Sequence, residues 1–378
     1  MTKAGPRRLL LVVNELQWLW THRLPVANAA RRAGWDVHVI SPPSTFKVRV
    51  EEAGFPVHDF LRPRGEDGFG SVLSNARRLR MAYAELSPTV VHHITLRPVL
   101  AGSLALRSGI DCGVVNAIAG LGSAFLGQGA GATLRRSGLV MALRFALRLR
   151  HSRTVFQNAE DRDECHRLGL VHPDHSVIIP GAGVDLQEFF VQPPPSLPKI
   201  LFVGRLLRDK GVFEFAEAAR LVRRHRPDAV FQLCGEPDPA NPSSLPEATV
   251  QGWVNEGTLA WLGQRWDMPQ VYANATIVAL PSHREGLPKV LLEAGASGRP
   301  AVATDATGCR EVIRDGVNGL LVPVGDAAAL AEAILRLIED PATAGAMGAE
   351  ARRIVEREYG VERVVAATLQ LYDELAAT

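Results

Sequence analysis

The chain has 378 residues, a length that favours two domains. Its 47% apolar and 22% charged residues are ordinary for a folded globular protein and exclude an intrinsically disordered chain. The net charge of +2 gives no reason to expect a nucleic-acid partner, and the four cysteines lie far apart without a Cys-x-x-Cys pair, so neither a zinc cage nor a disulfide framework is predicted.

The first half of the chain alternates short apolar strands with helical segments. The predicted strands are residues 9–13, 37–40, 57–61, 90–94 and 114–117, and the predicted helices are residues 22–33, 48–53, 75–85 and 99–107. Such alternation predicts a parallel sheet with helices on both faces.

A proline cluster, Gln192–Pro198, predicts a domain boundary, because proline runs are stiff and cannot join a sheet. The pattern then restarts, with strands at 199–203, 229–234, 259–262, 277–280 and 301–304 and helices at 212–224, 268–275, 289–296, 327–339 and 361–377. The fold class is therefore α/β, with two doubly wound domains at 1–192 and 193–360 and a C-terminal helix at 361–378 that we expect to cross back to the first domain. Ligands in such folds bind at the carboxyl ends of the strands.

The segment Pro281–Glu293 carries the strongest functional signal. Glu285 falls in the loop after a predicted strand, and Pro288 suits the start of the helix that carries Glu293. A helix N-terminus binds anions, and a carboxylate accepts hydrogen bonds from a sugar diol. These features suit a nucleotide sugar, with one carboxylate for the hexose, amides for phosphate and the other carboxylate for the ribose. The alternative is a surface helix with a capping acid at its start and one exposed glutamate.

A second signal follows the first strand of the second domain. Gly204 permits close approach of the backbone, and Arg205 and Lys210 are two cations suited to a diphosphate. The alternative is an ordinary basic turn, which we prefer for Arg208. Neither a Walker loop nor a dinucleotide fingerprint is present, and this argues against a nicotinamide dehydrogenase.

These two segments closely resemble the retaining, two-domain glycosyltransferases of family 4. The stretch Ala306–Gly319 resembles the segment that follows the double-glutamate motif of that family. The first half is similar to a branch that builds bacterial polysaccharide and glycan on undecaprenyl diphosphate, including N-acetylgalactosaminyltransferases. The matching pieces are Thr21–Pro25, His92–Pro98, Val115–Gly122 and Phe156–Arg162.

The resemblance implies a GT-B fold of two Rossmann-like domains, with a UDP-sugar donor on the second domain and a polyprenyl-diphosphate-linked sugar acceptor on the first. It also implies retention of anomeric configuration without a metal or other cofactor. The expected donor-binding residues are Gly204, Arg205, Lys210, Glu285, Gly286, Leu287, Pro288 and Glu293, and those given a catalytic role are Glu285, Arg205, Lys210 and His22. Two rival functions stay open here, a nucleotide-sugar epimerase and a non-catalytic scaffold.

Candidate acceptor residues follow the strands of the first domain. The expected acceptor-binding residues are His22, Arg23, Thr95, Arg97, Gly120 and Gly122. For His22 the alternative is that it and Arg23 lie at the start of a helix and bind local backbone groups. For the two glycines the alternative is a tight turn. His92 and His93 are adjacent in a strand and point to opposite faces, so at most one is expected to face a cleft.

Residues 134–153 hold six arginines and no acid. Arg136, Arg144 and Arg148 fall on one predicted helical stripe, beside an apolar stripe of Leu139, Leu143 and Leu147. A basic amphipathic helix suits an anionic membrane surface. We favour membrane contact because the resemblance implies a polyprenyl acceptor, and the expected location is then cytoplasmic, peripherally associated with the inner face of the cell membrane. The alternative is a helix packed on its own core with a solvated basic face.

The sequence Asp161–Asp163 has the form of a D-x-D metal motif. It follows Asn158, a good N-cap residue, and acidic side chains suit the first turn of a helix. We therefore interpret it as helix capping and not as a metal site.

Overall fold

The computed structural model describes residues 7–63, 69–107, 109–121 and 130–377. The chain divides into two compact units, one that runs to Ala182 and takes in the C-terminus from Glu362, and one that spans Gly183–Val361. The boundary between the two units lies before the proline cluster Gln192–Pro198, at which the sequence predicted it. The C-terminal helix belongs to the first unit, as the sequence predicted.

Within the described residues, the first unit contains a seven-stranded parallel sheet with the order β3-β2-β1-β4-β5-β6-β7. The strands are β1 (Arg8–Val12), β2 (Asp36–Ile40), β3 (Val57–His58), β4 (Val90–Ile94), β5 (Gly113–Ile118), β6 (Ser152–Phe156) and β7 (Ser176–Ile178). Central strands such as β4 and β5 are buried along their whole length, because helices cover both faces of the sheet.

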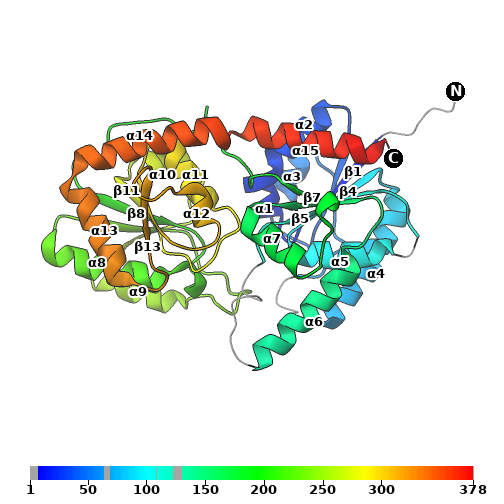
Figure 1. Ribbon diagram of the computed structural model, residues 1–378, viewed down its shortest axis with the longest axis horizontal. Coiled ribbons are helices and arrows are strands. Elements are labelled where there is room, and N and C mark those ends of the chain that lie inside the picture. The colour runs from blue at the N-terminus through cyan, green and yellow to red at the C-terminus, as the bar shows by residue number, and fades with distance from the viewer. Residues whose placement is uncertain (1–6, 64–68, 108, 122–129, 378) are drawn as a thin grey trace. The chain divides into compact units, whose positions relative to one another are not determined.

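Helices form the two outer layers of this unit (Figure 1). They are α1 (Leu16–Trp18), the π-helix η1 (Leu19–Arg23), α2 (Leu24–Arg32), α3 (Lys47–Glu52), α4 (Phe69–Leu86), α5 (Leu96–Leu106), α6 (Ala130–Ala146), α7 (Ala159–Arg167), the short η3 (Pro173–His175) and α15 (Val361–Ala376). One core packs α2, α3 and α15 on the sheet, with Trp35 and Tyr372 in edge-to-face contact. The opposite face packs α4, α5 and α6.

Within the described residues, the second unit contains a six-stranded parallel sheet with the order β10-β9-β8-β11-β12-β13. The strands are β8 (Lys199–Val203), β9 (Val230–Cys234), β10 (Ala260–Gly263), β11 (Ile277–Leu280), β12 (Ala301–Thr304) and β13 (Gly319–Val322). The strand order reverses between β8 and β11, which is the position where doubly wound sheets bind ligands.

Its helices are η4 (Arg208–Lys210), α8 (Val212–His225), α9 (Glu247–Asn255), α10 (Met268–Ala273), α11 (Lys289–Ala296), α12 (Cys309–Val312), α13 (Ala327–Glu339) and α14 (Pro341–Glu358). Helices α8 and α13 pack side by side on one face (Figure 1). Helices α10, α11 and α14 pack on the other. The α/β class and the doubly wound sheets predicted from the sequence are confirmed.

The structure also contains elements that the apolar pattern of the sequence does not predict, notably β7, α9, β13 and α14. Strand β7 is a three-residue edge strand whose residues are only partly buried or exposed, so its apolar pattern is weak. Helix α14 begins at Pro341, a residue that suits a first turn, and Asp340 caps it by accepting a hydrogen bond from the Thr343 amide at 3.0 Å.

Candidate active site

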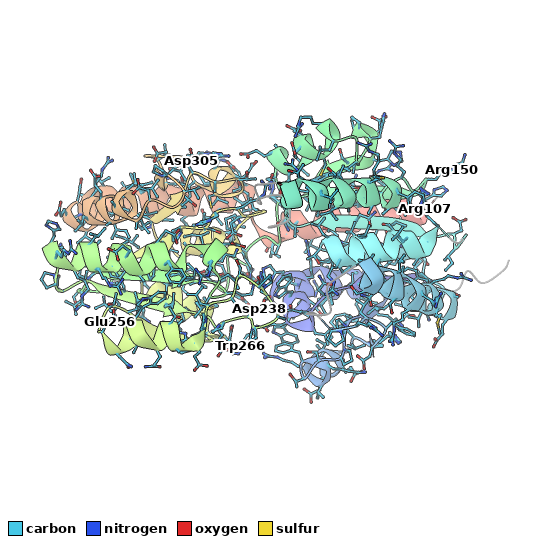
Figure 2. The ribbon with its side chains drawn as sticks, turned by 90° about the horizontal axis from the view of Figure 1, so that it is seen from below. Arg107, Arg150, Asp238, Glu256, Trp266 and Asp305 are labelled. Atoms are coloured by element: carbon cyan, nitrogen blue, oxygen red, sulfur yellow. The ribbon has the colours of Figure 1, made fainter. Side chains whose placement is uncertain are left out.

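The loops after β8, β9, β11 and β12 meet at the carboxyl edge of the second sheet. Figure 2 shows Asp238, from the loop after β9, at one end of this unit and Glu256, at the carboxyl end of α9, at the other. The predicted donor residues belong to the loops after β8 and β11 and to helix α11. They lie at the switch point that the strand order defines.

Lys210 and Glu285 meet at this point, although 75 residues separate them in the sequence. The Lys210 Nζ donates to both carboxylate oxygens of Glu285, at 2.5 and 2.6 Å. The two side chains are 22% and 12% exposed, so water screens this pair only partly. A cation and a carboxylate held together here can bind the phosphate and the sugar hydroxyls of one ligand.

Two glycines allow these loops to touch. Gly211 has φ +73°, and a Cβ at this position would lie 2.0 Å from the Pro281 carbonyl oxygen. Gly308 has φ +83°, and a Cβ there would lie 2.7 Å from the Glu285 carbonyl oxygen. Any larger residue at either position would push apart the backbone segments that bring Lys210 to Glu285.

Arg205 also belongs to this edge, but it has a partner that the sequence analysis missed. Its Nη1 donates to the Asp238 carboxylate at 2.6 Å, and the Asp238 amide donates to the Ser244 hydroxyl at 2.9 Å. Gly204 and Gly235 permit the contact between these two loops, since a Cβ on Gly235 would lie 2.0 Å from the Gly204 carbonyl oxygen. An acid about thirty residues from its partner carries no sequence signal, because a loop after another strand supplies it.

Helix α11 starts at Lys289, after Pro288, and no side chain caps its first turn. Its first amide groups are therefore suited to an anion such as phosphate. Glu293 is buried and accepts from the Lys289 Nζ at 2.8 Å. Because Glu293 is buried, the alternative of an exposed glutamate on a surface helix is wrong for this residue. The predicted role of Glu293 at a ribose stays a prediction.

His283 and Cys309 also lie in these loops. The His283 Nε2 and Glu214 Oε1 are 3.0 Å apart, and the His283 amide donates to the Asp209 carbonyl at 2.9 Å. Burial, assisted by the nearby Glu285 carboxylate, raises the pKa of the Cys309 thiol to about 12. That thiol is therefore protonated at neutral pH and is no nucleophile.

The switch point of the first sheet lies between β1 and β4. Asn14 follows β1, and its Nδ2 donates to the Thr95 hydroxyl after β4 at 2.8 Å. Thr95 has φ +76° and ψ +161°, an outlier for a β-branched residue that is typical of functional sites. Thr95 was a predicted acceptor residue. Asn14 was not, because its role depends on the neighbouring strand.

His22 and Arg23 have different surroundings. Both lie in the π-helix η1, a form of helix often found at functional sites. His22 is exposed, and its Nδ1 lies 2.7 Å from the Thr21 hydroxyl. Arg23 is 6% exposed, donates to the Gly181 carbonyl at 3.3 Å, and has its pKa lowered by burial. A covered guanidinium does not fit the expectation that Arg23 binds the acceptor.

The remaining acceptor candidates fall near the same edge. Arg97 lies in the first turn of α5 and Gly120, with φ +124°, follows β5. Gly122 lies outside the described residues.

Both histidines of β4 are buried in the core, which agrees with the expectation that at most one of them would face a cleft. The two rings do bind opposite layers: His92 Nδ1 lies 2.6 Å from the Tyr372 hydroxyl, and His93 lies 2.9 Å from the Tyr83 hydroxyl and 2.7 Å from Asn116.

The basic segment differs from its prediction in two respects. Helix α6 ends at Ala146, so Arg148 is not on it, and Leu143 is fully buried in the unit's own core. The predicted apolar stripe therefore packs inward. A different stripe is exposed, formed by Leu134, Met141 and Phe145 at 76%, 69% and 55% exposure.

Two arginines of this segment bind other residues of the same unit. Arg136 pairs with Glu164 at 2.7 Å, and Arg144 donates to the Leu168 carbonyl at 2.6 Å. Among the described residues, no helix is long and apolar enough to span a bilayer.

The interpretation of Asp161–Asp163 as helix capping is confirmed. The Asn158 side chain accepts from the Asp161 amide at 2.7 Å at the start of α7, and Asp161 is buried. Asp163 pairs with Arg162 at 2.8 Å. Within the described part of the chain, no group of three potential metal-ligating side chains comes together.

Comparison with solved structures identifies the fold. Sucrose-phosphate synthase from Thermosynechococcus elongatus is 21% identical, with a TM-score of 0.81 over 98% of this chain and 99% of that one. Anabaena HepE in complex with UDP and glucose is 20% identical, with a TM-score of 0.76 over 98% of this chain and 100% of that one. The two parallel-sheet units thus form a GT-B fold.

Curated relatives match across both units. The "N,N'-diacetylbacillosaminyl-diphospho-undecaprenol alpha-1,3-N-acetylgalactosaminyltransferase" of Campylobacter jejuni is 28% identical over 85% of this chain and 87% of the relative. The "UDP-Gal:alpha-D-GlcNAc-diphosphoundecaprenol alpha-1,3-galactosyltransferase" of Escherichia coli is 25% identical over 84% of this chain and 86% of the relative. Neither is an epimerase.

Two family models account for most of the chain. Residues 8–158 match "Glycosyl transferase 4-like", and residues 197–340 match "Glycosyl transferases group 1". The first model covers β1 to β6 and the loops that carry Asn14 and Thr95, and the second covers the loops that carry Lys210 and Glu285. With one model on each unit and a GT-B fold, the protein belongs to the glycosyltransferases of family 4.

Proposed function

We propose that the protein transfers a hexose or N-acetylhexosamine, with retention, from a UDP-sugar to a polyprenyl-diphosphate-linked sugar during synthesis of a surface polysaccharide or glycan. The observation that carries the donor half is the Lys210–Glu285 pair at the switch point of the second sheet. The acceptor half rests on two relatives, whose names specify undecaprenyl-diphosphate-linked substrates.

Each charged group of the site has a role in this proposal. Lys210 and Arg205, whose carboxylate partners are Glu285 and Asp238, donate hydrogen bonds to the diphosphate, and Glu285 accepts hydrogen bonds from the sugar hydroxyls. The first amides of α11 hold a phosphate, and Glu293 holds the ribose. Fixed charges of this kind stabilise the leaving UDP as negative charge develops on it, so no metal is needed in this scheme.

The reaction breaks the bond between the anomeric carbon and the phosphate oxygen and forms one between that carbon and the acceptor oxygen. The acceptor attacks on the face from which UDP leaves, and its proton passes to a phosphate oxygen of the leaving group. No covalent enzyme intermediate is required, in accord with the protonated thiol of Cys309. His22, exposed on η1, is the side chain that we assign to the acceptor.

A carrier of this kind lies in a membrane, which gives the exposed stripe of α6 a function. We assign Leu134, Met141 and Phe145 to contact with an anionic bilayer, in a segment, residues 134–153, that carries six arginines and no acid. The protein then acts peripherally, at the cytoplasmic face of the membrane.

The direct test has two steps. Nucleotide sugars are screened for an increase in melting temperature, and those that bind are then tested for transfer to a polyprenyl-diphosphate-linked sugar. We expect one UDP-sugar to be consumed only when the acceptor is present. Conversion of the donor sugar without an acceptor would instead establish an epimerase, and the absence of donor binding would leave only a scaffold.

A further inference from the structure

A cavity lies in the second unit, at the amino edge of its sheet. It has a volume of about 610 Å³, which is within the usual range for small-molecule sites. Pro198, Thr276 and Pro300 line it, and they directly precede β8, β11 and β12. The donor loops follow the same strands, so this cavity is at the opposite edge of the sheet from the candidate active site.

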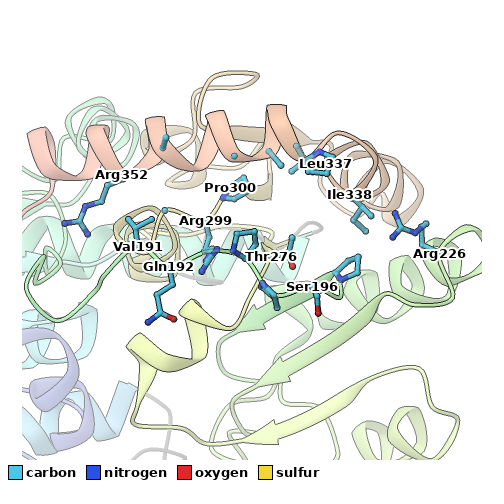
Figure 3. A pocket seen from close by; sticks show the side chains of 18 residues that line it. Val191, Gln192, Ser196, Arg226, Thr276, Arg299, Pro300, Leu337, Ile338 and Arg352 are labelled. Carbon is cyan, nitrogen blue, oxygen red and sulfur yellow. The ribbon is translucent and has the colours of Figure 1, made fainter.

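The wall of the cavity is mainly apolar. It is formed by the proline-rich segment 191–198, the end of α13 at Leu337 and Ile338, and the first turns of α14, including Ala344 (Figure 3). An apolar wall of this extent favours a hydrocarbon body in the ligand.

The charges around the cavity have one sign. Its lining contains three arginines, Arg226, Arg299 and Arg352, and no acidic residue. Figure 3 shows Arg299 in the middle of the lining, with Arg352 and Arg226 toward its two ends. Arg226 pairs with Asp228 at 2.8 Å and Arg352 with Glu356 at 2.5 Å, so these two are already neutralised.

Arg299 is different because no carboxylate among the described residues pairs with it. It is 3% exposed, and its Nε and Nη2 donate to the Tyr272 and Ala273 carbonyls at 3.2 and 2.7 Å. These bonds cap the carboxyl end of α10, whose dipole gives the guanidinium a partial negative charge as its partner and no carboxylate. Burial lowers its pKa with no acid acting in the other direction, yet an arginine stays charged in proteins. A buried cation without a counter-ion favours an anion.

We propose that this cavity is a binding site for a single-chain aliphatic carboxylate, whose anionic head lies toward Arg299 and whose chain lies against the prolines and the aliphatic residues of α13 and α14. The site is separate from the donor site and does not depend on the proposed transfer reaction. It links to the donor loops through α11, which starts at the donor edge and ends just before Arg299.

The probe is decanoate, with decylammonium and 1-decanol as ligands of equal chain length and different charge. Calorimetric titration and amide exchange of the full chain measure binding. We expect saturable binding of decanoate, with protection of residues 191–198 and 341–352, and binding at least tenfold weaker for the other two. Equal binding of decanoate and decylammonium would overturn the proposal, as would protection elsewhere in the chain.

Cavity-filling variants locate the site without breaking a hydrogen bond. Gly345 lines the cavity in α14, and a Cβ there would meet no atom within 4 Å, so Gly345→Leu adds its side chain to this space. Gly252→Leu in α9 is the matched control, since Gly252 is also helical and unobstructed. We expect decanoate affinity to fall at least tenfold in the first and to be unchanged in the second.

Ala349→Leu, on the exposed rim of the same helix, serves if Gly345→Leu does not fold. Unchanged decanoate affinity in the folded cavity variant would reject the site. None of these readouts involves sugar transfer, so failure here leaves the proposed function intact.

Discussion

Both sheets place a side-chain contact across their switch points, but the two contacts differ in charge. In the second unit a lysine meets a glutamate, Lys210 with Glu285, and in the first an amide meets a hydroxyl, Asn14 with Thr95. Fixed charges suit a diphosphate that departs as an anion, whereas neutral donors and acceptors suit the recognition of hydroxyl groups. Both units therefore offer a ligand site at the switch point of their sheet. The residues in the loops decide which ligand binds at each site.

The backbones at the two positions differ as well. The second unit uses glycines, Gly211 and Gly308, where a positive φ or close contact is needed. The first unit has a threonine at positive φ and stabilises it with a hydrogen bond. The interiors of the two sheets differ in polarity as well. Strand β4 of the first sheet carries two buried histidines, whereas β11 of the second sheet is wholly apolar.

The largest expected effect is at the charged switch point. Replacing Glu285 by Ala should reduce turnover by about 10²–10³, because a fixed group that binds the reacting sugar is lost. Initial rates of transfer measure this, with unfolding curves to verify the fold. Glu256→Ala, which removes a glutamate that pairs with Arg220 at the other end of the unit, is the control and should leave turnover unchanged. A fully active Glu285→Ala enzyme would remove the donor assignment.

A second variant tests the close contact itself. Gly308→Ala should reduce turnover by about 10²-fold, since its Cβ would collide with the carbonyl oxygens of Glu285 and Gly286. Gly316→Ala is matched, because Gly316 also has positive φ, +72°, but no atom lies near its Cβ. Both glycines have a positive φ, so a Cβ strains the backbone at each position, and Gly308 with ψ −38° lies outside the left-handed helical region. Equal loss of turnover in the two would mean that strain, and not the contact, matters.

The difference between the interiors predicts a pH dependence. Burial lowers the pKa of His93 to about 4, against about 6.5 in the unfolded chain. The unfolded state therefore binds a proton first as the pH falls, and the free energy of unfolding should drop by about 3 kcal/mol between pH 6.5 and 4.

Amide exchange at pH 7 and pH 5 measures this effect for each unit. Protection should fall first in the first unit, at β4 and its neighbours, and the control is the apolar sheet of the second unit. Loss of protection in the second unit before the first would contradict the prediction.

The neutral switch point should contribute less to the reaction. Asn14→Ala removes the hydrogen bond to Thr95 and should reduce kcat/KM for the acceptor by about 10-fold, from the loss of about 1–1.5 kcal/mol. The affinity for the donor nucleotide, measured by titration, should not change. A weakened donor affinity with unchanged acceptor kinetics would reverse the roles assigned to the two units.

The smallest effect is expected at the membrane stripe. Changing Leu134, Met141 and Phe145 together to Ser should weaken binding to anionic vesicles by about 10-fold, since exposed apolar area no longer enters the bilayer. Co-sedimentation measures it, and transfer to a water-soluble acceptor analogue should be unaffected. Leu73→Ser with Met81→Ser on α4, which are also exposed, is the control pair. If that pair weakened binding equally, α6 would have no special role.

The sequence by itself determined the fold class and the donor loops. Apolar strands alternating with helices require a parallel sheet covered on both faces, and this local pattern does not depend on distant residues. The proline and glycine signals around Glu285 are equally local, and so is the cap at Asn158. Weakly patterned elements such as β7 escaped prediction, because an exposed edge strand lacks a clear apolar period.

Only the tertiary structure decided which side chains meet. The contact of Lys210 with Glu285, the pairing of Arg205 with Asp238 and the bond from Asn14 to Thr95 each join loops after different strands. Strand order sets these neighbours, and strand order is not written in any local stretch of sequence. Burial was decided in the same way. Arg23 is buried and reaches the Gly181 carbonyl, and the core face of α6 turns Leu139 and Leu143 inward and leaves Leu134, Met141 and Phe145 outside.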